Sequence, residues 1–535
     1  MTQSATPEQH PIQAAIAPGY AFDQEVVEVG ALMVDADTLT DTAIRIPLAM
    51  FNRHGLVAGA TGTGKTKTLQ VLAEQLSAAG VSVFAADVKG DLTGLGVPGE
   101  HSDKIVERAA GVGQQWEATG FPVELLALGG RGNGIPVRVT MSSFGPLLLA
   151  KVLGLNATQE SSLGLVFHYA DKAGLPLLDL ADLRAVVHHL TSPEGKPDLK
   201  DLGGLSSATA GVILRELITF ADQGADAFFG EPEFDTSDLF RVADDGRGVI
   251  SLLELPELAN RPAVFSTFLM WLLADLFNEL PEVGDIEKPK LVFFFDEAHL
   301  LFKGASKDFL EQVAQTVRLI RSKGVGVFFV TQAPTDVPDE VLAQLGSRVQ
   351  HQLRAHTPND AKALKQTVNT YPHPAYDDLG RVLTSLGIGE AVVTVMNEKG
   401  APTPVAWTRL RAPESLMSPA DDAWLEQQVA GSSLRARYAD ALDRESAREI
   451  LAQRLERGAQ KAAEENADDG AGAGADDGLA PHQREAEKLS KRRTPTQRKQ
   501  DKDLVEKVVE SGAFKDFMRT AAREIARGVF RTGRR

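Results

Sequence analysis

Residues 59–66 read GATGTGKT, and this stretch decides the fold of the chain. It matches the pattern G-x-x-x-x-G-K-[ST], in which a glycine-rich backbone wraps around phosphate groups. A short apolar segment, Leu56–Ala58, comes directly before it, and a helical pattern with Leu69, Leu72 and Leu76 on one face follows. That order of strand, loop and helix predicts a nucleoside triphosphate site. A chance glycine-rich turn is the alternative, and the flanking segments argue against it.

Each part of the loop has an expected task. Glycines let backbone N–H groups approach the β-phosphate, Lys65 can bridge the β- and γ-oxygens, and the Thr66 hydroxyl can hold Mg²⁺. The expected ligands are therefore a nucleoside triphosphate and Mg²⁺. The residues predicted to bind the nucleotide are Gly59, Ala60, Thr61, Gly62, Thr63, Gly64, Lys65 and Thr66.

A second motif, LVFFFDEAH at residues 291–299, predicts a buried strand that delivers two carboxylates at its carboxyl end. Asp296 can hold Mg²⁺, directly or through a water, and Glu297 can orient and deprotonate the water that attacks the γ-phosphate. A strand that ends in two solvated acids is the alternative. Beside a complete phosphate loop, the pair indicates a hydrolase.

A third motif, GVGVFFVTQ at residues 324–332, predicts another buried strand, which ends in Thr331 and Gln332. Such a strand is expected between the phosphate-loop strand and the Asp-Glu strand. Gln332 would then lie within reach of the attacking water as a γ-phosphate sensor. The alternative is a glutamine that simply caps the strand.

The helix predicted between these two strands, at about 307–323, carries Arg318 and Arg321 near its end. An arginine that reaches the γ-phosphate of a neighbouring subunit would neutralise developing charge. For either arginine the alternative is a solvated cation that the helix dipole favours.

A polar segment follows the strand predicted at 81–86, in the sequence AADVKGDLTGL. The carboxyl end of a parallel strand is where open α/β sheets place functional groups. Asp87, at the end of the strand, is a possible accessory residue, Asp91 could help to order the metal shell or the nucleotide, and Lys89 could contact a polyanion. A simple polar turn is equally compatible with these residues.

Composition excludes several classes of protein. The chain has 535 residues, enough for two to four folding units, and its 43% apolar and 24% charged residues are ordinary for a soluble protein. The absence of cysteine excludes disulfides, thiolate zinc sites and a cysteine nucleophile. The first residues lack the features of a signal peptide, and the most apolar helical pattern, 263–277, is interrupted by Asp275 and too short to span a bilayer. We expect a cytoplasmic protein without a membrane span.

Charge is distributed unevenly. The net charge is −17, yet the segment from Pro481 onward has 16 Lys and Arg against 8 Asp and Glu. A basic tail of this kind can contact nucleic acid, an acidic membrane or the acidic body of its own protein.

The remaining pattern alternates short apolar strands with helices, which predicts an α/β fold with a mostly parallel sheet. Strands are expected at 81–86, 248–253, 291–295, 325–331 and 349–353, with a hairpin at 391–396 and 405–410. The predicted parts are a disordered N-terminus at 1–20, a short β segment at 21–50, an ATPase core at 51–410 with a helical insertion at about 100–245, a charged helical region at 418–465, a low-complexity linker at 466–500 and a basic amphipathic tail helix at 501–535.

Together, GATGTGKT, DVKGD, FFFDEAH, R-x-x-R-S-K-G-V-G and FFVTQ resemble the HerA–FtsK superfamily of hexameric P-loop ATPases, most closely its YjgR-type HerA-like bacterial proteins. The resemblance implies a RecA-like core, a homo-oligomeric ring with shared active sites, ATP as the nucleotide and movement of double-stranded DNA. It also implies metal-linked work at Asp296, water activation at Glu297, sensing at Gln332 and a trans arginine at Arg321. The N-terminal β segment is much shorter than the barrel of HerA helicases and the net charge is acidic, and both departures weigh against DNA translocation and a nuclease partner.

Two functions from different classes follow. The first is an ATP-hydrolysing motor of HerA type that acts on double-stranded DNA as a translocase or helicase. The second is a nucleotide-gated oligomeric scaffold that regulates a protein partner. A phosphoryl transferase to a small molecule is disfavoured, because Glu297 and Gln332 suit water as the acceptor.

Overall fold

The computed structural model describes residues 10–471, except 36, 131, 200–202, 256–261, 285, 303–304, 306 and 373–374. The chain divides into two units, Met1–Leu455 and Glu456–Arg535. The strands given below, and every helix except the end of the last, belong to the first unit.

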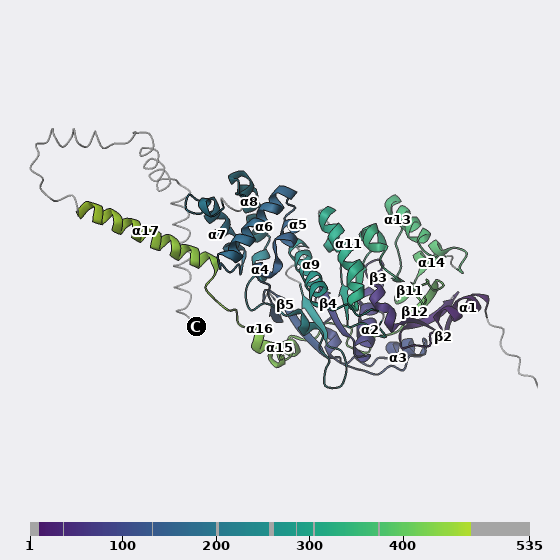
Figure 1. Ribbon diagram of the computed structural model, residues 1–535. Coiled ribbons are helices and arrows are strands. Elements are labelled where there is room, and N and C mark those ends of the chain that lie inside the picture. The colour runs from purple at the N-terminus through teal and green to yellow at the C-terminus, as the bar shows by residue number, and fades with distance from the viewer. Residues whose placement is uncertain are drawn as a thin grey trace, which may run out of the picture. The chain divides into compact units, whose positions relative to one another are not determined.

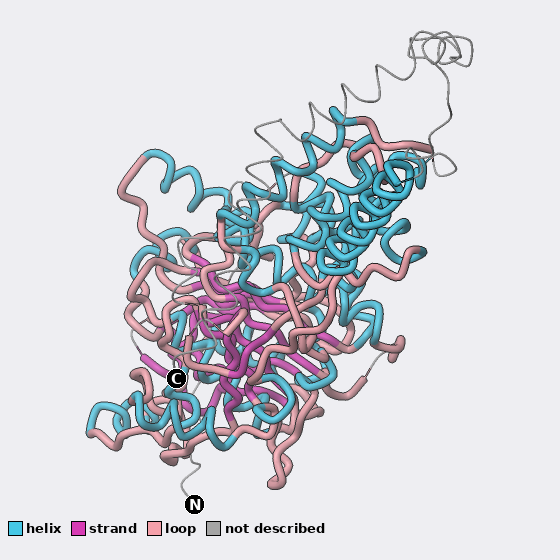
Figure 2. Tube along the Cα trace, turned by 90° about the vertical axis from the view of Figure 1, so that its left-hand side faces the viewer, coloured by secondary structure: helices cyan, strands magenta, loops and turns pink. Residues whose placement is uncertain are grey.

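The first unit is built on one twelve-stranded sheet, which Figure 2 shows at its centre. Among the described residues, seven of the eleven neighbouring strand pairs are parallel, which confirms the predicted α/β fold. In spatial order the strands are β2 Asp37–Pro47, β1 Val26–Val34, β12 Ala406–Leu410, β11 Glu390–Thr394, β10 Ser347–Gln350, β3 Gly55–Ala58, β9 Val325–Thr331, β8 Leu291–Phe295, β4 Ser82–Asp87, β7 Ile250–Glu254, β5 Val123–Leu128 and β6 Ile135–Val137.

Helices cover both faces of this sheet (Figure 1). Along β4, Phe84 packs with α9 and α11 in one core, whereas Val83 packs with α2 in the other. This alternation follows from the two-residue period of a strand. The α-helices are α1 Pro11–Ile16, α2 Lys65–Ala78, α3 Asp103–Ala110, α4 Met141–Phe144, α5 Pro146–Val152, α6 Ala157–Lys172, α7 Leu180–Thr191, α8 Ser207–Asp222, α9 Pro262–Glu279, α10 His299–Phe302, α11 Lys307–Ile320, α12 Asp339–Leu342, α13 Pro358–Asn369, α14 Leu379–Ser385, α15 Asp422–Gly431, α16 Arg435–Tyr438 and α17 Ala447–Ala471.

The central strands are apolar along their whole length because both of their faces are covered. All five residues of β8 are fully buried. Its Phe294 and Phe295 stack against Phe328 and Phe329 of β9, with ring centroids 5.4 and 5.7 Å apart. This packing accompanies the parallel register of β8 and β9, in which Phe295 is paired with Phe329. Within the described part of the chain, each helix is too short or too polar to cross a membrane.

The N-terminal segment departs from the prediction. Residues 1–9 lie outside the described residues, but residues 11–20, expected to be disordered, form α1 and a 3₁₀ turn. Ile16 and Tyr20 are buried, and Tyr20 Oη donates to Pro404 O at 2.8 Å. Two apolar anchors therefore order a segment whose proline- and glutamine-rich composition suggested disorder. The β segment that follows joins the main sheet, because β1 pairs with β12.

The helical insertion was predicted to begin at about residue 100, but the first part of that range contains two strands of the main sheet. Helices α4–α8 occupy residues 141–222 and pack around Leu163, Val186 and Leu217. Strands β5 and β6 precede them and extend the parallel sheet beyond β7. The β5 sequence, VELLAL, is a short apolar run, and such runs suit a buried helix or a buried strand equally well.

In the C-terminal part, the secondary structure has the predicted type, but the elements begin and end at other residues than predicted. The predicted hairpin is confirmed as the antiparallel pair β11 and β12. In the region expected to be helical at 418–465, α15, α16 and α17 form, and α17 continues into the predicted linker as far as Ala471. The rest of that linker and the predicted tail helix at 501–535 lie outside the described residues.

Candidate nucleotide-hydrolysing site

The phosphate loop joins β3 to α2, as its sequence predicts. Gly62 and Gly64 have φ angles of +82° and +107°, which glycine adopts without strain. At Gly59, an added Cβ would lie 2.4 Å from the Cβ of His351. The first turn of α2 has no side-chain cap, because Gly64 occupies its N-cap position. Its N–H groups and the positive end of its dipole therefore suit an anion.

The Lys65 side chain lies inside this loop. Its Nζ donates to Gly59 O at 2.8 Å and to Ala60 O at 3.2 Å. Burial lowers the pKa of Lys65, and the negative charge of Glu297 opposes that change. The ammonium group is thus hydrogen-bonded to the loop, and it interacts electrostatically with the predicted catalytic carboxylate.

His351, which was not among the site residues predicted from the sequence, contacts the phosphate loop and the first turn of α2. Its backbone N donates to Ala58 O at 2.7 Å, and its ring nitrogens lie 3.1 Å from Thr63 O and 2.9 Å from Thr68 Oγ1. The side chain is fully buried. The strand was predicted at 349–353, which placed His351 inside it, whereas β10 ends at Gln350. The available signal was a histidine within a predicted strand, and it lies beside the loop because β10 and β3 are parallel.

The buried His351 predicts how stability depends on pH. Burial, followed by the charge of Lys65, lowers its pKa from 6.5 to about 3. The unfolded chain therefore takes up the proton first as the pH falls, so this stability is complete above about pH 6.5 and is lost toward about pH 3. At pH 5 we expect the free energy of unfolding to be about 2 kcal/mol lower than at a pH well above 6.5. Urea unfolding at the two pH values measures this difference.

The matched variant is His351→Gln, which keeps a polar side chain without a titrating ring. It should have a shallower dependence on pH between 6.5 and 5. Some dependence should remain, because burial also lowers the pKa of His54, to about 4. An unchanged slope in His351→Gln would contradict the assignment.

The Asp-Glu pair lies at the same edge of the sheet as the phosphate loop. Strand β9 lies between β3 and β8, as predicted. Ala58 pairs with Thr331, and Phe295 pairs with Phe329, so the residues that follow all three strands are neighbours. The phosphate loop and the Asp-Glu pair, which are more than 200 residues apart in the sequence, therefore lie close together in the fold.

Asp296 is buried behind this edge, and only one of its oxygens is hydrogen-bonded. Oδ1 accepts from Glu297 N at 2.9 Å, whereas the buried Oδ2 has no hydrogen-bond partner. Burial raises the pKa of Asp296 to about 7, against the opposing charge of Lys89. A buried, unpaired carboxylate oxygen close to the phosphate loop fits a ligand of Mg²⁺ or of its bound water.

Glu297 has an unusual backbone and two nitrogen neighbours. Its φ of +48° is rare for a residue other than glycine. Oε1 lies 2.5 Å from Lys89 Nζ, and Oε2 lies 3.2 Å from His299 Nδ1. Burial would raise the pKa of Glu297, but the hydrogen bond and charge of Lys89 outweigh it and lower that pKa.

The three predicted accessory residues have different surroundings in the structure. Asp87 organises the turn after β4, because its carboxylate accepts from the backbone N of Gly90 at 2.7 Å and of Leu92 at 2.8 Å. Lys89 contacts Glu297 and so belongs to the site. Asp91 is partly exposed, with a buried Oδ1 that has no hydrogen-bond partner.

The predicted sensor lies at the expected end of its strand. Gln332 is exposed directly after β9, and Thr331 Oγ1 donates to Asp336 Oδ2 at 2.8 Å. Asp336 also accepts from Ala333 N at 2.8 Å, so the backbone on either side of Gln332 is fixed. Its role as a sensor remains a prediction.

The two predicted arginines lie elsewhere. Arg318 is in the last turn of α11, and Arg321 immediately follows that helix, ahead of β9. They are therefore at the amino end of β9, and its seven residues place them roughly 20 Å from the phosphate-binding edge of the same chain. Neither arginine can act on a nucleotide held by its own chain in this arrangement.

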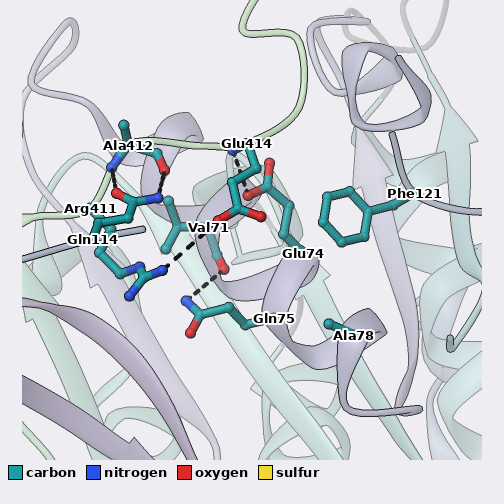
Figure 3. A pocket seen from close by; sticks show the side chains of 9 residues that line it. All are labelled: Val71, Glu74, Gln75, Ala78, Gln114, Phe121, Arg411, Ala412 and Glu414. Atoms are coloured by element: carbon teal, nitrogen blue, oxygen red, sulfur yellow. Dashed lines mark hydrogen bonds and ion pairs between the residues drawn. The ribbon is translucent and has the colours of Figure 1, made fainter. Parts of the chain in front are cut away.

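The far half of α2 is clamped by the segment that follows β12. Glu74 accepts from the backbone N of Glu414 at 3.0 Å, and Gln114 Nε2 donates to Ala412 O at 2.9 Å (Figure 3). Glu74 also accepts from the backbone N of Ser415 at 3.0 Å. A cavity of about 40 Å³ has Glu74, Gln114, Ala412 and Glu414 among the residues that line it. Glu74 is nine residues from Lys65, roughly 13 Å along the helix, so this cavity is separate from the phosphate loop.

Comparisons with known proteins agree with this geometry. The family model described as "Helicase HerA-like C-terminal" matches residues 33–535. The chain is 21% identical over 386 residues to the DNA double-strand break repair helicase HerA of Saccharolobus solfataricus, covering 70% of this chain and 68% of the relative. It is 25% identical over 394 residues to the probable helicase MJECL08 of Methanocaldococcus jannaschii, with the same coverage of 70% and 68%.

Among solved structures, the bacterial conjugative coupling protein TrwBdeltaN70, in its unbound monoclinic form, is similar with a TM-score of 0.50 and 15% identity. The match covers 76% of this chain and 94% of that chain, and it supports the predicted RecA-like fold. The narrower likeness to YjgR-type proteins stays a prediction. From its family match and its motifs, the chain belongs to the Helicase HerA-like C-terminal family of P-loop ATPases.

Proposed function

We propose that this protein hydrolyses ATP with Mg²⁺ and couples the hydrolysis to the movement of double-stranded DNA through a homo-oligomeric ring. One observation carries the catalytic half of the proposal. The phosphate loop, Gln332 and the Asp296-Glu297 pair follow three adjacent parallel strands and end at one edge. A triphosphate on the loop would therefore present its γ-phosphate to Glu297.

The reaction needs few covalent events from the protein. The water oxygen forms a bond to the γ-phosphorus, the bond to the β,γ-bridging oxygen breaks, and its electron pair stays on the β-phosphate of ADP. Glu297 accepts the proton of the water, and Lys65 neutralises charge on the β- and γ-oxygens. Thr66 and Asp296 would hold Mg²⁺, which supplies further charge neutralisation when bound.

The proposed movement of DNA is supported by the family match and by the two relatives, one named a DNA double-strand break repair helicase and the other a probable helicase. The position of Arg321 adds a physical argument for an oligomer. Because it lies at the sheet edge opposite its own phosphate loop, it can reach only a nucleotide of another subunit. A ring of identical subunits would bring the two edges together across each interface.

The direct experiment measures ATP hydrolysis by the purified protein with and without long duplex DNA. We expect hydrolysis without DNA and stimulation with it. Hydrolysis that duplex DNA leaves unchanged, in a protein that still assembles, would favour the nucleotide-gated scaffold.

Binding to duplex DNA should depend strongly on salt. Each phosphate contact releases counterions, so the logarithm of the affinity should fall linearly with the logarithm of the salt concentration. For about six contacts we expect a loss of roughly 10³-fold between 50 and 200 mM salt, measured by fluorescence anisotropy. With a net charge of −17, binding without a local basic surface would be weak and insensitive to salt, and that result would contradict the DNA motor.

A further inference from the structure

Lys89 is held at the site by a rigid turn. Asp87 ends β4, and its carboxylate accepts from the backbone N of Lys89 at 3.2 Å, of Gly90 at 2.7 Å and of Leu92 at 2.8 Å. Gly90 has a φ of +72°, which closes the turn. The backbone of Lys89 is thus fixed, while its side chain is 47% exposed.

The ammonium group of Lys89 contacts the predicted general base directly. Its Nζ lies 2.5 Å from Glu297 Oε1, and Glu297 is only 10% exposed on its side chain. The other oxygen, Oε2, lies 3.2 Å from His299 Nδ1. Oε1 therefore accepts a hydrogen bond from an ammonium group, which reduces the basicity of the carboxylate, whereas the buried Oε2 has no hydrogen-bond partner. Release of Oε1 from the ammonium group would make Glu297 a stronger base toward the attacking water.

The same ammonium group lies close to where a γ-phosphate would be. The attacking water must be within hydrogen-bond distance of Glu297 and next to the phosphorus, which puts the phosphorus roughly 6 Å from the carboxylate. A half-exposed lysine side chain spans that distance by rotation. The charges of Lys89 and Glu297 both influence Lys65, so the three groups share one space.

We propose that Lys89 is a second cationic ligand of the γ-phosphate, and that it leaves Glu297 for that phosphate when a triphosphate binds. This inference rests on the proposed ATPase function. The exchange frees Glu297 Oε1 to accept the proton of the water and adds a positive charge where negative charge develops. A diphosphate has no γ-phosphate, so Lys89 remains on Glu297 and the base stays engaged.

The test compares Lys89→Met with wild type by calorimetric binding of a non-hydrolysable ATP analogue and of ADP, each with Mg²⁺. A charge-assisted hydrogen bond to phosphate outweighs a half-exposed ion pair, so we expect roughly tenfold weaker binding of the analogue. ADP should bind within about twofold of wild type. Turnover should fall roughly 10²-fold, with partial recovery in Lys89→Arg.

The matched control is Lys172→Met, on the exposed end of α6, and circular dichroism checks that each variant folds. An ATP-to-ADP affinity ratio that Lys89→Met leaves unchanged would overturn the phosphate contact, whatever happens to turnover. If wild type itself bound no ATP, the proposed function would fail instead. The two failures are therefore distinguishable.

A second measurement uses Glu297→Gln. Loss of the carboxylate releases Lys89, so the analogue should bind about two- to fivefold more tightly. The gain should disappear in the Lys89→Met/Glu297→Gln double variant. Simple charge repulsion between Glu297 and the nucleotide predicts the reverse, a larger gain when Lys89 is absent, and that result would overturn the exchange.

Discussion

Glu297→Gln is expected to lower the turnover number for ATP by roughly 10²–10⁴-fold while nucleotide binding survives. The amide keeps the size of the side chain and cannot accept the proton of the attacking water. Phosphate contacts from the Gly59–Thr66 loop are unaffected, because Glu297 lies two strands away from β3.

The measurement is hydrolysis at saturating ATP together with equilibrium binding of a non-hydrolysable analogue. Glu426→Gln, an exposed glutamate on α15, is the matched control and should hydrolyse ATP at the wild-type rate. Turnover within about threefold of wild type in Glu297→Gln would remove this residue from the mechanism.

The sequence was sufficient for the features that local patterns determine. The phosphate loop is contiguous, and its glycines are needed for local backbone reasons. The Asp296-Glu297 pair is marked by five apolar residues directly before it. The position of β9 between β3 and β8 was also predicted, because ATPases with an Asp-Glu pair usually have such a strand there.

Contacts between distant segments could not be predicted in the same way. Lys89 and Glu297 are 208 positions apart, and only the parallel order of β8 and β4 brings them together. His351 was missed for a similar reason, since its value depends on β10 lying next to β3. A single sequence indicates many of the strands but gives little information about which segments lie beside them.

The errors in the predicted fold have a different cause. Local composition favoured one structure, whereas a few apolar residues that become buried determine another. Tyr20 and Ile16 order a segment that is otherwise polar and rich in turn formers. In β5, a run of six residues carries no periodicity that separates a strand from a helix. In both segments the apolar side chains are buried against other parts of the chain, and this burial cannot be predicted from the local sequence.

Arg321→Ala is expected to lower turnover by roughly 10³–10⁵-fold, if the residue contacts the γ-phosphate of a neighbouring subunit. The backbone around Arg321 is held in place, because Gly324 N donates to Arg321 O at 3.0 Å and Val283 N donates to Ser322 O at 2.9 Å. Arg318→Ala, one turn earlier on α11, tests the other candidate in the same assay. A variant of either residue that retains the wild-type rate is not the trans arginine.

Mixing subunits decides whether the arginine acts between chains. Arg321→Ala supplies an intact Glu297, and Glu297→Gln supplies an intact Arg321, so each protein alone should be inactive. In an equal mixture that exchanges subunits, about one quarter of the interfaces combine both intact residues if the arginine acts in trans. Recovery of activity is then expected in proportion, whereas an arginine acting within its own chain would give none. The distance of roughly 20 Å along β9 makes recovery the expected result.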